Sequence, residues 1–332
     1  MGYPLATAGD SPDQFPAGID VTASPVYTGT FIPEIWSGKL IEKFYDATVI
    51  GAIANTDYEG EISSYGDKVK IRTKPDVTIK QYQAEQVLEF ERPSSSIVEL
   101  NIDQGYYFNT ILDDVMEVQA DLNLMSMWSD DASEQMKIRI DTEVLAYMPT
   151  EVDADNQGNT AGKLSQNLDF GTSLVPLDMV ARNPAANETE VIDLIVAFGQ
   201  ALDEQNIPEN GRWIIVPAWM AAMIKKSELR DASLTGDGQT MLRNGRLGMI
   251  DRFELYASNL LPTSVPTDAL GDATAIMAGH KHGMTFASQM SKMETLRGES
   301  TFGTIMRGLQ VYGRKMTDGI SVCLAYSRKS AV

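Results

Sequence analysis

The sequence predicts an α+β fold with an elongated part and a compact part. Three observations lead to this prediction. Two runs with a period of two lie within residues 57–103, a long helical pattern follows to residue 148, and mixed helix and strand patterns then give way to strand-like runs over 274–290 and 305–327. The chain has 332 residues, so it is long enough to bury a sizeable core.

The first region, residues 1–38, contains five prolines, five glycines and no lysine or arginine. Such a composition does not propagate a helix or a central strand. One interpretation is a disordered tail. The other, which we favour, is an arm that becomes ordered by contact with a neighbouring subunit. Residues 34–53, which include Trp36, have the pattern of a helix or a helical pair.

Residues 57–103 predict a long β-hairpin. Basic and apolar residues alternate over 68–74, and acidic or polar residues alternate with apolar residues over 98–103. Opposite charges across such an antiparallel pair contribute about 0.2–1 kcal/mol each. The apolar face has no second layer within the hairpin, and an isolated hairpin is marginally stable. We therefore expect it to lie on another chain, with contacts from Lys68, Lys70, Ile71, Arg72, Lys74 and Leu100.

The strongest helical pattern covers residues 109–148, where apolar residues recur at spacings of three and four. Asn109 is the expected N-cap, and Pro149 follows the expected end. The weak helix formers of residues 126–131 predict a break before Ser129.

The second half of the chain predicts shorter elements. Residues 150–187 are rich in Asn, Gly and Asp and predict an extended loop. We expect helices over 188–205 and 218–226, strands over 213–216 and 250–256, and a turn at 317–319. An exposed loop is expected over 227–248, where Gly236 and Gly238 supply a permissive backbone.

Composition and charge exclude several classes of protein. Arginine and lysine number 27 against 46 acidic residues, which gives a net charge of −19. This acidity argues against a protein that wraps nucleic acid with its whole surface. No apolar window is long enough to span a membrane, and the first residues lack the pattern of a signal peptide. We expect a soluble protein that is made and kept in a reducing compartment.

The sequence offers no constellation for catalysis, a cofactor or a metal. The two histidines, His280 and His282, lie in one strand-like run and would need at least one more ligand to hold a metal. Cys323 is the single cysteine and lies in an apolar strand, where a thiol behaves as a small hydrophobic group. A Gly-x-Ser-x-Gly elbow is absent from the sequence. We expect no enzyme, no cofactor and no metal.

Three local motifs, in their order along the chain, resemble a known family. They are residues 252–262 (RFELYASNLLP), residues 278–287 (AGHKHGMTFA), and residues 308–313 (GLQVYG) with 318–322 (DGISV). Together with the order of the larger parts, they resemble the major capsid protein of tailed bacteriophages, which has the Hong Kong 97-type capsid fold. The resemblance covers nearly the whole chain.

The resemblance implies a division of the chain. Residues 1–38 would be the N-terminal arm, 39–56 the entry to the peripheral (P) domain, and 57–103 the E-loop hairpin. Residues 104–187 would belong to the peripheral domain, with its spine helix at about 122–148. Residues 188–272 would form the axial (A) domain, and 273–332 the return strands of the peripheral domain.

The resemblance also implies function and partners. Many copies would assemble as hexamers and pentamers into the icosahedral head shell, enclosing double-stranded DNA without sequence-specific binding. Assembly would take place in the host cytoplasm, and the protein would reside in the virion. A separate scaffolding protein is implied because the charged scaffolding helices of some members are missing, together with a portal protein and, as an optional partner, a decoration protein.

Further contact residues are expected at Trp36, Gly236 and Gly238, with the loop 227–248 near the symmetry axis of each capsomer. Some members crosslink a lysine to a neighbour's asparagine. Lys68, Lys70, Lys74 and Lys80 lie in the matching region, but the sequence does not place the other partners, so no crosslink residue is assigned.

Two other functions remain open at this stage. An encapsulin has the same fold but encloses enzymes through cargo peptides, and phage terminase and portal genes beside this one would argue against it. An unrecognised soluble enzyme is the third hypothesis, and particles of megadalton size would exclude it.

Overall fold

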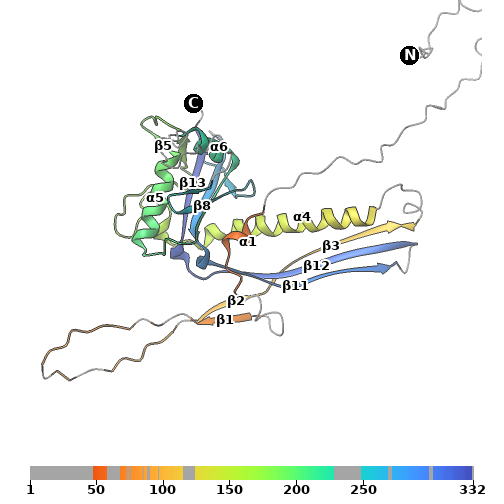
Figure 1. Cartoon of the computed structure of the whole chain (residues 1–332), viewed down its shortest axis with the longest axis horizontal. Coiled ribbons are helices and arrows are strands. Elements are labelled where there is room, and N and C mark those ends of the chain that lie inside the picture. Colours follow the sequence, from red (N-terminus) through yellow and green to blue (C-terminus); the bar gives the residue numbers. More distant parts are fainter. Residues whose placement is uncertain are drawn as a thin grey trace, which may run out of the picture. The chain divides into compact units, whose positions relative to one another are not determined.

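The computed structural model describes residues 48–57, 68–72, 75, 77–84, 86–87, 90–95, 97–114, 124–227, 248–267, 271–298 and 302–330. These residues form three β-sheets, of two, three and eight strands, with helices packed against the two larger ones (Figure 1). The expected arm 1–38 and most of the expected loop 227–248 lie outside the described residues.

The eight-stranded sheet is built from the second half of the chain. It runs in the order β5 (Glu188–Glu190), β4 (Leu177–Val180), β13 (Val322–Lys329), β10 (Ala273–His280), β6 (Arg212–Val216), β8 (Phe253–Ala257) and β7 (Met249–Ile250), and β9 (Thr263–Ser264) also pairs with β10. The three central strands, β13, β10 and β6, pair antiparallel with one another, whereas β4 joins β13, β5 joins β4 and β8 joins β6 by parallel pairing.

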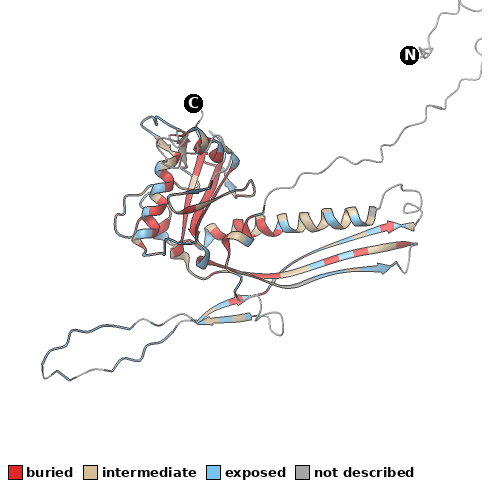
Figure 2. Cartoon of the chain, viewed as in Figure 1, coloured by how far each residue is buried: buried red, intermediate tan, exposed pale blue. Residues whose placement is uncertain are grey.

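Both faces of this sheet are covered. Ile214 and Val216 of β6 pack into a cluster with α5 (Val191–Glu204) and α6 (Ala218–Lys226), whereas Trp213 and Ile215 pack with α1 (Ile50–Ile53) and the end of α4 (Leu124–Tyr147). Every residue of β6 is therefore buried, and Figure 2 shows buried residues throughout the central strands. A strand that is buried on both faces has a continuous apolar sequence, as the run Trp213–Val216 does.

The three-stranded sheet has the antiparallel order β11 (Met284–Arg297), β12 (Gly303–Met316) and β3 (Gln104–Asp113). Helix α4 contacts β3 and β12 on one face. The side chains of β3 alternate strictly, so that Tyr106, Phe108 and Leu112 face inward and Tyr107 and Ile111 face outward. We call these the helix face and the outer face of the sheet.

Two connections join the two larger sheets. Strand β10 leads through a 3₁₀ turn at Lys281–Gly283 into β11, and β12 leads through a 3₁₀ turn at Gly319–Ser321 into β13. The segment 273–332 thus contributes to both larger sheets. Strands β10 and β13 lie at the centre of the eight-stranded sheet, and the assignment of 273–332 to the return strands of the peripheral domain stays a prediction.

Several predicted elements are confirmed. Helix α6 covers the predicted residues, β6 and α5 agree with their predictions to within three residues, and α4 matches the expected spine helix. The 3₁₀ segments Met148–Thr150 and Ala154–Asn156 follow α4, the first around Pro149.

Five predictions about local structure are corrected. Residues 109–113 belong to strand β3, so Asn109 is not a helix N-cap, and α4 continues unbroken through Ser129. Strand β4 lies within the expected loop 150–187. The expected strand 250–256 is divided by a tight turn at Asp251 and Arg252, whose φ angles of 43° and 67° are left-handed. His282 lies in a 3₁₀ turn rather than in a strand with His280.

Candidate subunit interface

The base of the hairpin is the two-stranded sheet of β1 (Lys68–Arg72) and β2 (Ile97–Asn101). The strands pair antiparallel, with Lys70 opposite Glu99 and Ile71 opposite Val98. The Lys70 ammonium lies 3.5 Å from the Glu99 carboxylate. Strand pairing and charge complementarity are thus confirmed, and Lys68, Lys70 and Arg72 are all exposed.

The apolar face of this base is covered within the same chain. Leu100 is fully buried and Ile102 nearly so, in a cluster with Ala287 of β11, and Val69, Ile71 and Val311 of β12 pack against it. The expectation that Leu100 contacts another subunit is therefore wrong. The second layer comes from the outer face of the three-stranded sheet, about 190 positions later in the chain for Ala287.

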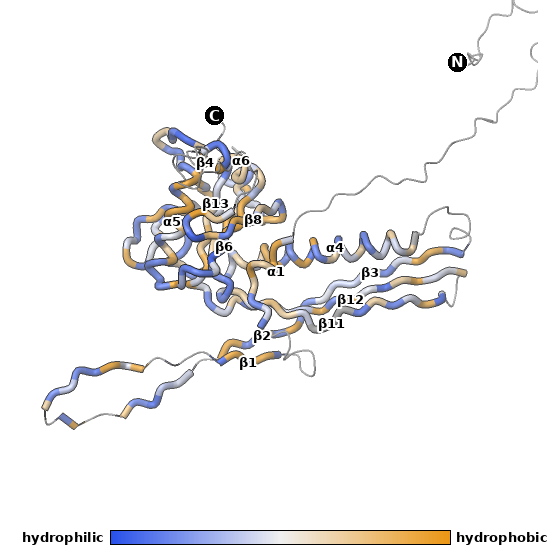
Figure 3. The backbone as a smooth tube through the Cα atoms, viewed as in Figure 1, coloured by the Kyte–Doolittle hydropathy of each residue, from blue (hydrophilic) through white to orange (hydrophobic). Residues whose placement is uncertain are grey.

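The segment between β1 and β2 has a different character. Its large apolar side chains are exposed, including Ile79 at 90% and Phe90 at 100%. Val77, Tyr82 and Val87 are also exposed, and the orange parts of the trace between β1 and β2 in Figure 3 show this hydrophobic content. The Thr78 backbone N–H and hydroxyl donate hydrogen bonds of 3.2 and 3.1 Å to the two Glu91 carboxylate oxygens. These bonds join the segment that follows β1 to the segment that precedes β2. We call the described residues of 77–95 the hairpin tip.

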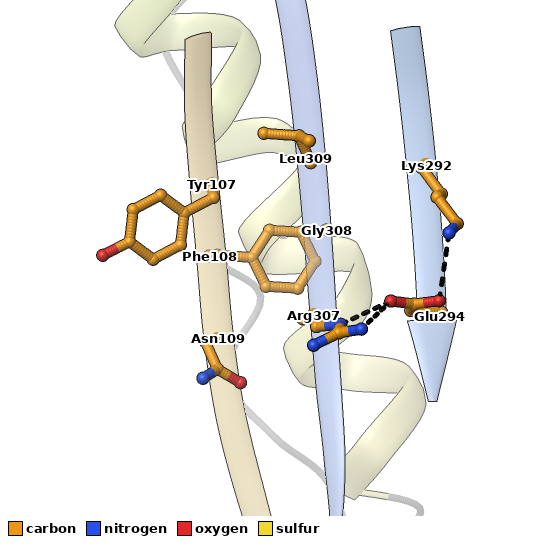
Figure 4. Close-up of a pocket in the computed structure, with 8 residues that line it drawn as sticks. All are labelled: Tyr107, Phe108, Asn109, Lys292, Glu294, Arg307, Gly308 and Leu309. Atoms are coloured by element: carbon orange, nitrogen blue, oxygen red, sulfur yellow. Dashed lines mark hydrogen bonds and ion pairs between the residues drawn. The ribbon is translucent and has the colours of Figure 1, made fainter. Parts of the chain in front are cut away.

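The outer face of the three-stranded sheet is a second exposed surface. Tyr107 is 78% exposed, and Ile111, Leu296 and Leu309 are exposed around it. A hollow of about 560 Å³ on this surface is lined by Tyr107, Phe108, Asn109, Lys292, Glu294, Arg307, Gly308 and Leu309. Figure 4 shows these residues on three adjacent strands.

A charge cluster stands at one side of the outer-face hollow. Arg307 of β12 and Lys292 of β11 both turn toward Glu294 (Figure 4). The Arg307 Nε lies 2.5 Å from Glu294 Oε1, and the Lys292 Nζ lies 3.3 Å from Oε2. Hydrogen bonds from Arg307 and then Lys292 hold the pKa of Glu294 below its ordinary value. The hollow therefore offers apolar walls beside a fixed group of charges, which suits a peptide surface.

The helix face is held by a single carboxylate. Glu143 of α4 accepts hydrogen bonds from the Tyr106 hydroxyl of β3 and, at 2.7 Å, from the Tyr312 hydroxyl of β12. Its other oxygen lies 2.5 Å from Arg314, whose guanidinium stacks over the Tyr147 ring at 4.9 Å. Burial opposes ionisation of Glu143, but the two hydroxyls and the Arg314 charge outweigh it and lower its pKa. We call this group the Glu143 clamp.

The remaining expected site residues divide into two groups. Trp36, Lys74, Gly236 and Gly238 lie outside the described residues. Lys68, Lys70 and Arg72 are exposed on the hairpin base and Ile71 is half-buried there, so contacts from them remain a prediction. His280 accepts from the backbone N–H of His282 and bonds the Asn210 carbonyl at 2.8 Å, an arrangement that terminates β10. The described residues contain no cluster of three potential metal ligands.

Sequence reasoning missed the outer-face hollow. The signal was present in the alternation of Tyr106, Phe108 and Thr110 with Tyr107, Asn109 and Ile111, which has a strand period. The hollow itself also needs β11 and β12 alongside β3, and their register could not be derived from spacing.

Comparison with protein families decides the identity. The phage capsid protein family matches residues 106–322, which is well over half of the chain. This chain belongs to the phage capsid protein family. The match includes the spine helix and most of both larger sheets.

Solved structures agree with this assignment. A structure from Mycobacterium phage Che8 is 25% identical to this capsid protein, covers 89% of this chain and 97% of its own, and superposes with a TM-score of 0.69. The capsid of cyanophage P-SCSP1u is 17% identical over 90% of this chain and 94% of its own, with a TM-score of 0.67. The mature capsid of bacteriophage PhiM1 is 13% identical over 96% and 98%, with a TM-score of 0.64.

These comparisons establish the Hong Kong 97-type capsid fold and a structural role in the head shell, and they do not favour the encapsulin alternative. None of the curated protein sequences matches this capsid protein. Among the described helices, none is both long and apolar enough to cross a bilayer.

Proposed function

We propose that this capsid protein builds an icosahedral shell of hexamers and pentamers around double-stranded DNA, and that the hairpin tip of one subunit covers the outer face of its neighbour. The observation that carries the proposal is the exposure of five large apolar side chains on the hairpin tip. Burying one such side chain fully contributes roughly 1.5–3 kcal/mol. An unassembled subunit forgoes that stabilisation.

The outer face suits this partner on chemical grounds. Its exposed Tyr107 and Leu309 offer apolar contact area, and its charge cluster carries two cations around one carboxylate. The hairpin tip carries Glu91, and its residues 77–83 belong to no helix and to none of the described sheets. Apolar burial would supply the strength of the contact, since exposed ion pairs contribute only about 0–1 kcal/mol each.

The acidity of the subunit supports a container for DNA. A net charge of −19 avoids the strong phosphate attraction of a basic inner wall, so the DNA would be enclosed without being bound tightly. A separate scaffolding protein, a portal protein and an optional decoration protein complete the proposed partners, with assembly in the host cytoplasm.

The hairpin tip is tested by single substitutions with matched charge. Ile79→Asp places a carboxylate at the proposed contact, and Gln81→Asp places one two residues away on the same exposed segment. We expect Ile79→Asp to leave free subunits and Gln81→Asp to form shells, measured by sedimentation and negative-stain electron microscopy. Normal shells from Ile79→Asp would overturn the hairpin contact.

The outer face has its own matched pair. Tyr107 and Asn109 are both exposed on β3, and Tyr107→Asp removes the aromatic wall of the hollow whereas Asn109→Asp changes charge alone. We expect only Tyr107→Asp to block assembly. If both variants assemble while Ile79→Asp fails, the hairpin tip binds elsewhere on the neighbour.

The expected arm and axial loop are also proposals. Deleting residues 1–30 should leave a folded subunit that assembles poorly, and normal shells from the truncated chain would refute an ordering role in assembly. A map of the shell should place the loop 227–248 beside a five-fold or six-fold axis. DNA enclosure is tested by nuclease treatment of purified heads, which should leave their double-stranded DNA intact.

A further inference from the structure

A buried carboxylate lies where the first described residues meet the spine helix. Asp141 of α4 is only 5% exposed. Its Oδ2 accepts a hydrogen bond of 2.6 Å from the backbone N–H of Val49, which lies 92 positions earlier. This hydrogen bond therefore joins the start of the first described segment, residues 48–57, to helix α4, which packs against the three-stranded sheet.

The bond acts as a helix cap supplied by another element. Helix α1 is one turn long, and its N-cap residue, Val49, has no side-chain oxygen for the first free N–H groups. The Asp141 carboxylate takes that role for Val49 and also interacts with the backbone N–H of Ile50. The entry turn Val49–Ala54 thus depends on one acidic side chain for its cap.

The surroundings of Asp141 are apolar. Val49, Ile50, Ile53, Val144 and Leu145 belong to the buried cluster that packs between the entry turn, α4 and the eight-stranded sheet. A carboxylate in such a place is costly when it is ionised without a partner of opposite charge.

The charged groups of the packed elements are engaged elsewhere. On α4, Lys137 pairs with Glu134, Arg139 lies over the Tyr106 ring, and Glu143 pairs with Arg314 of β12. On β12 and β6, Lys315 pairs with Glu151 and Arg212 with Asp203. The described entry residues 48–57 carry one charged side chain, Asp57, which is exposed. Strand β10 and the start of β11 (284–288) carry one titratable side chain, His280, which pairs with Arg212 of β6. No ion pair among the described residues reaches Asp141.

We propose that Asp141 is a proton-operated latch: the uncharged acid holds the entry turn Val49–Ala54 against the spine helix, and ionisation loosens it. The inference concerns the folded subunit itself and is independent of how shells assemble.

The direction follows from linkage between protonation and opening. Burial raises the pKa of Asp141 to about 6, although the backbone N–H groups of Val49 and Ile50 oppose the shift. Once the turn detaches, the carboxyl meets water and its pKa returns toward 3.8. The closed state therefore binds the proton more tightly, and opening becomes easier as pH rises. Two such pKa values make the opening equilibrium about tenfold larger at pH 7 than at pH 5.

Hydrogen exchange of the full-length protein tests the latch. The amides of Val49–Ala54 are followed at pH 5 and pH 7, and each rate is divided by the intrinsic rate at that pH. We expect protection in wild type to fall about tenfold from pH 5 to pH 7. In Asp141→Asn, whose carboxamide oxygen still accepts the Val49 N–H, protection should be the same at both pH values.

The matched control is Asp130→Asn, which neutralises an exposed acid on the same helix and should retain the wild-type pH dependence. Wild-type protection that is constant or rises with pH overturns the latch, even if Asp141→Asn fails to fold. A tenfold change that persists in Asp141→Asn overturns it as well, because another group would then be responsible.

Discussion

The Glu143 clamp gives the sharpest test of how the spine helix is held. Glu143→Ala removes the acceptor of two tyrosine hydroxyls and the partner of Arg314. Tyr312 is fully buried, so its hydroxyl would be left without the acceptor at a cost of roughly 1–3 kcal/mol. Arg314 is mostly buried and would lose its counter-charge, for which the cost in fully buried pairs is about 3–5 kcal/mol.

Both Glu143 and Arg314 retain some access to water, so their pair is worth less than the buried value. We expect Glu143→Ala to lower the free energy of unfolding by about 3–4 kcal/mol. Tyr312→Phe removes a single hydrogen bond to a charged acceptor and should cost about 1.5–2 kcal/mol. The control, Glu134→Ala, removes an exposed pair with Lys137 on the same helix and should cost at most about 0.5 kcal/mol.

The assay is urea unfolding of unassembled full-length subunits, followed by tryptophan fluorescence. Trp213 is fully buried in the cluster that also contains Tyr312, so it reports on this region. The double variant Glu143→Ala, Tyr312→Phe should lose less than the sum of the single losses, because one interaction is removed twice. If Glu143→Ala is no less stable than Glu134→Ala, the carboxylate does not hold the helix and the reasoning is refuted.

Four further predictions concern single residues. Leu100→Ala should lower the free energy of unfolding by about 2–5 kcal/mol in the urea assay, because the residue is buried within its own chain. Gly279→Ala should cost about 1–3 kcal/mol in the same assay, since its Cβ would lie 2.8 Å from the Ser321 carbonyl oxygen and 3.1 Å from the Trp213 ring. The Cys323 thiol, whose pKa is raised by burial, should resist a thiol reagent in the folded protein and react fully in urea. The Glu143 contribution, whose folded pKa is lowered, should be present above the ordinary pKa of 4.5 and be lost as pH falls below it, so the cost of Glu143→Ala should shrink in acid.

The sequence predicted elements whose pattern is local. The alternation of basic and apolar residues over 68–74 predicted a strand and an acidic face on its partner strand. The short apolar run before Pro217 predicted a buried strand, and the residues after Pro217 predicted a helix. Residues 109–113 were ambiguous because Ile111 fits the helical spacing as well as the strand period. The helical assignment failed there because pairing with β12 stabilises the strand.

Contacts between distant residues could not be predicted. The Glu143 clamp joins residues that are 37 and 169 positions apart in the sequence. The burial of Leu100 depends on β11 and β12, which lie near the end of the sequence. Apolar periodicity shows that a face will be covered but does not show by what. For this reason Leu100 was expected at a subunit contact, although its cover is intramolecular.

The paired connection between the two larger sheets has a mechanical consequence. The Thr317 hydroxyl and backbone N–H donate hydrogen bonds of 2.8–3.1 Å to the carbonyl oxygens of His282 and Gly283. These bonds hold the β10–β11 connection and the β12–β13 connection together. A force that acts through both connections reaches β10 and β13 at the same end of the sheet and moves the two strands as one unit. The load then falls in shear on the rows of hydrogen bonds to β6 and β4, where many bonds must break at once. A force along β10 and β13 would therefore be resisted by two rows of hydrogen bonds loaded together.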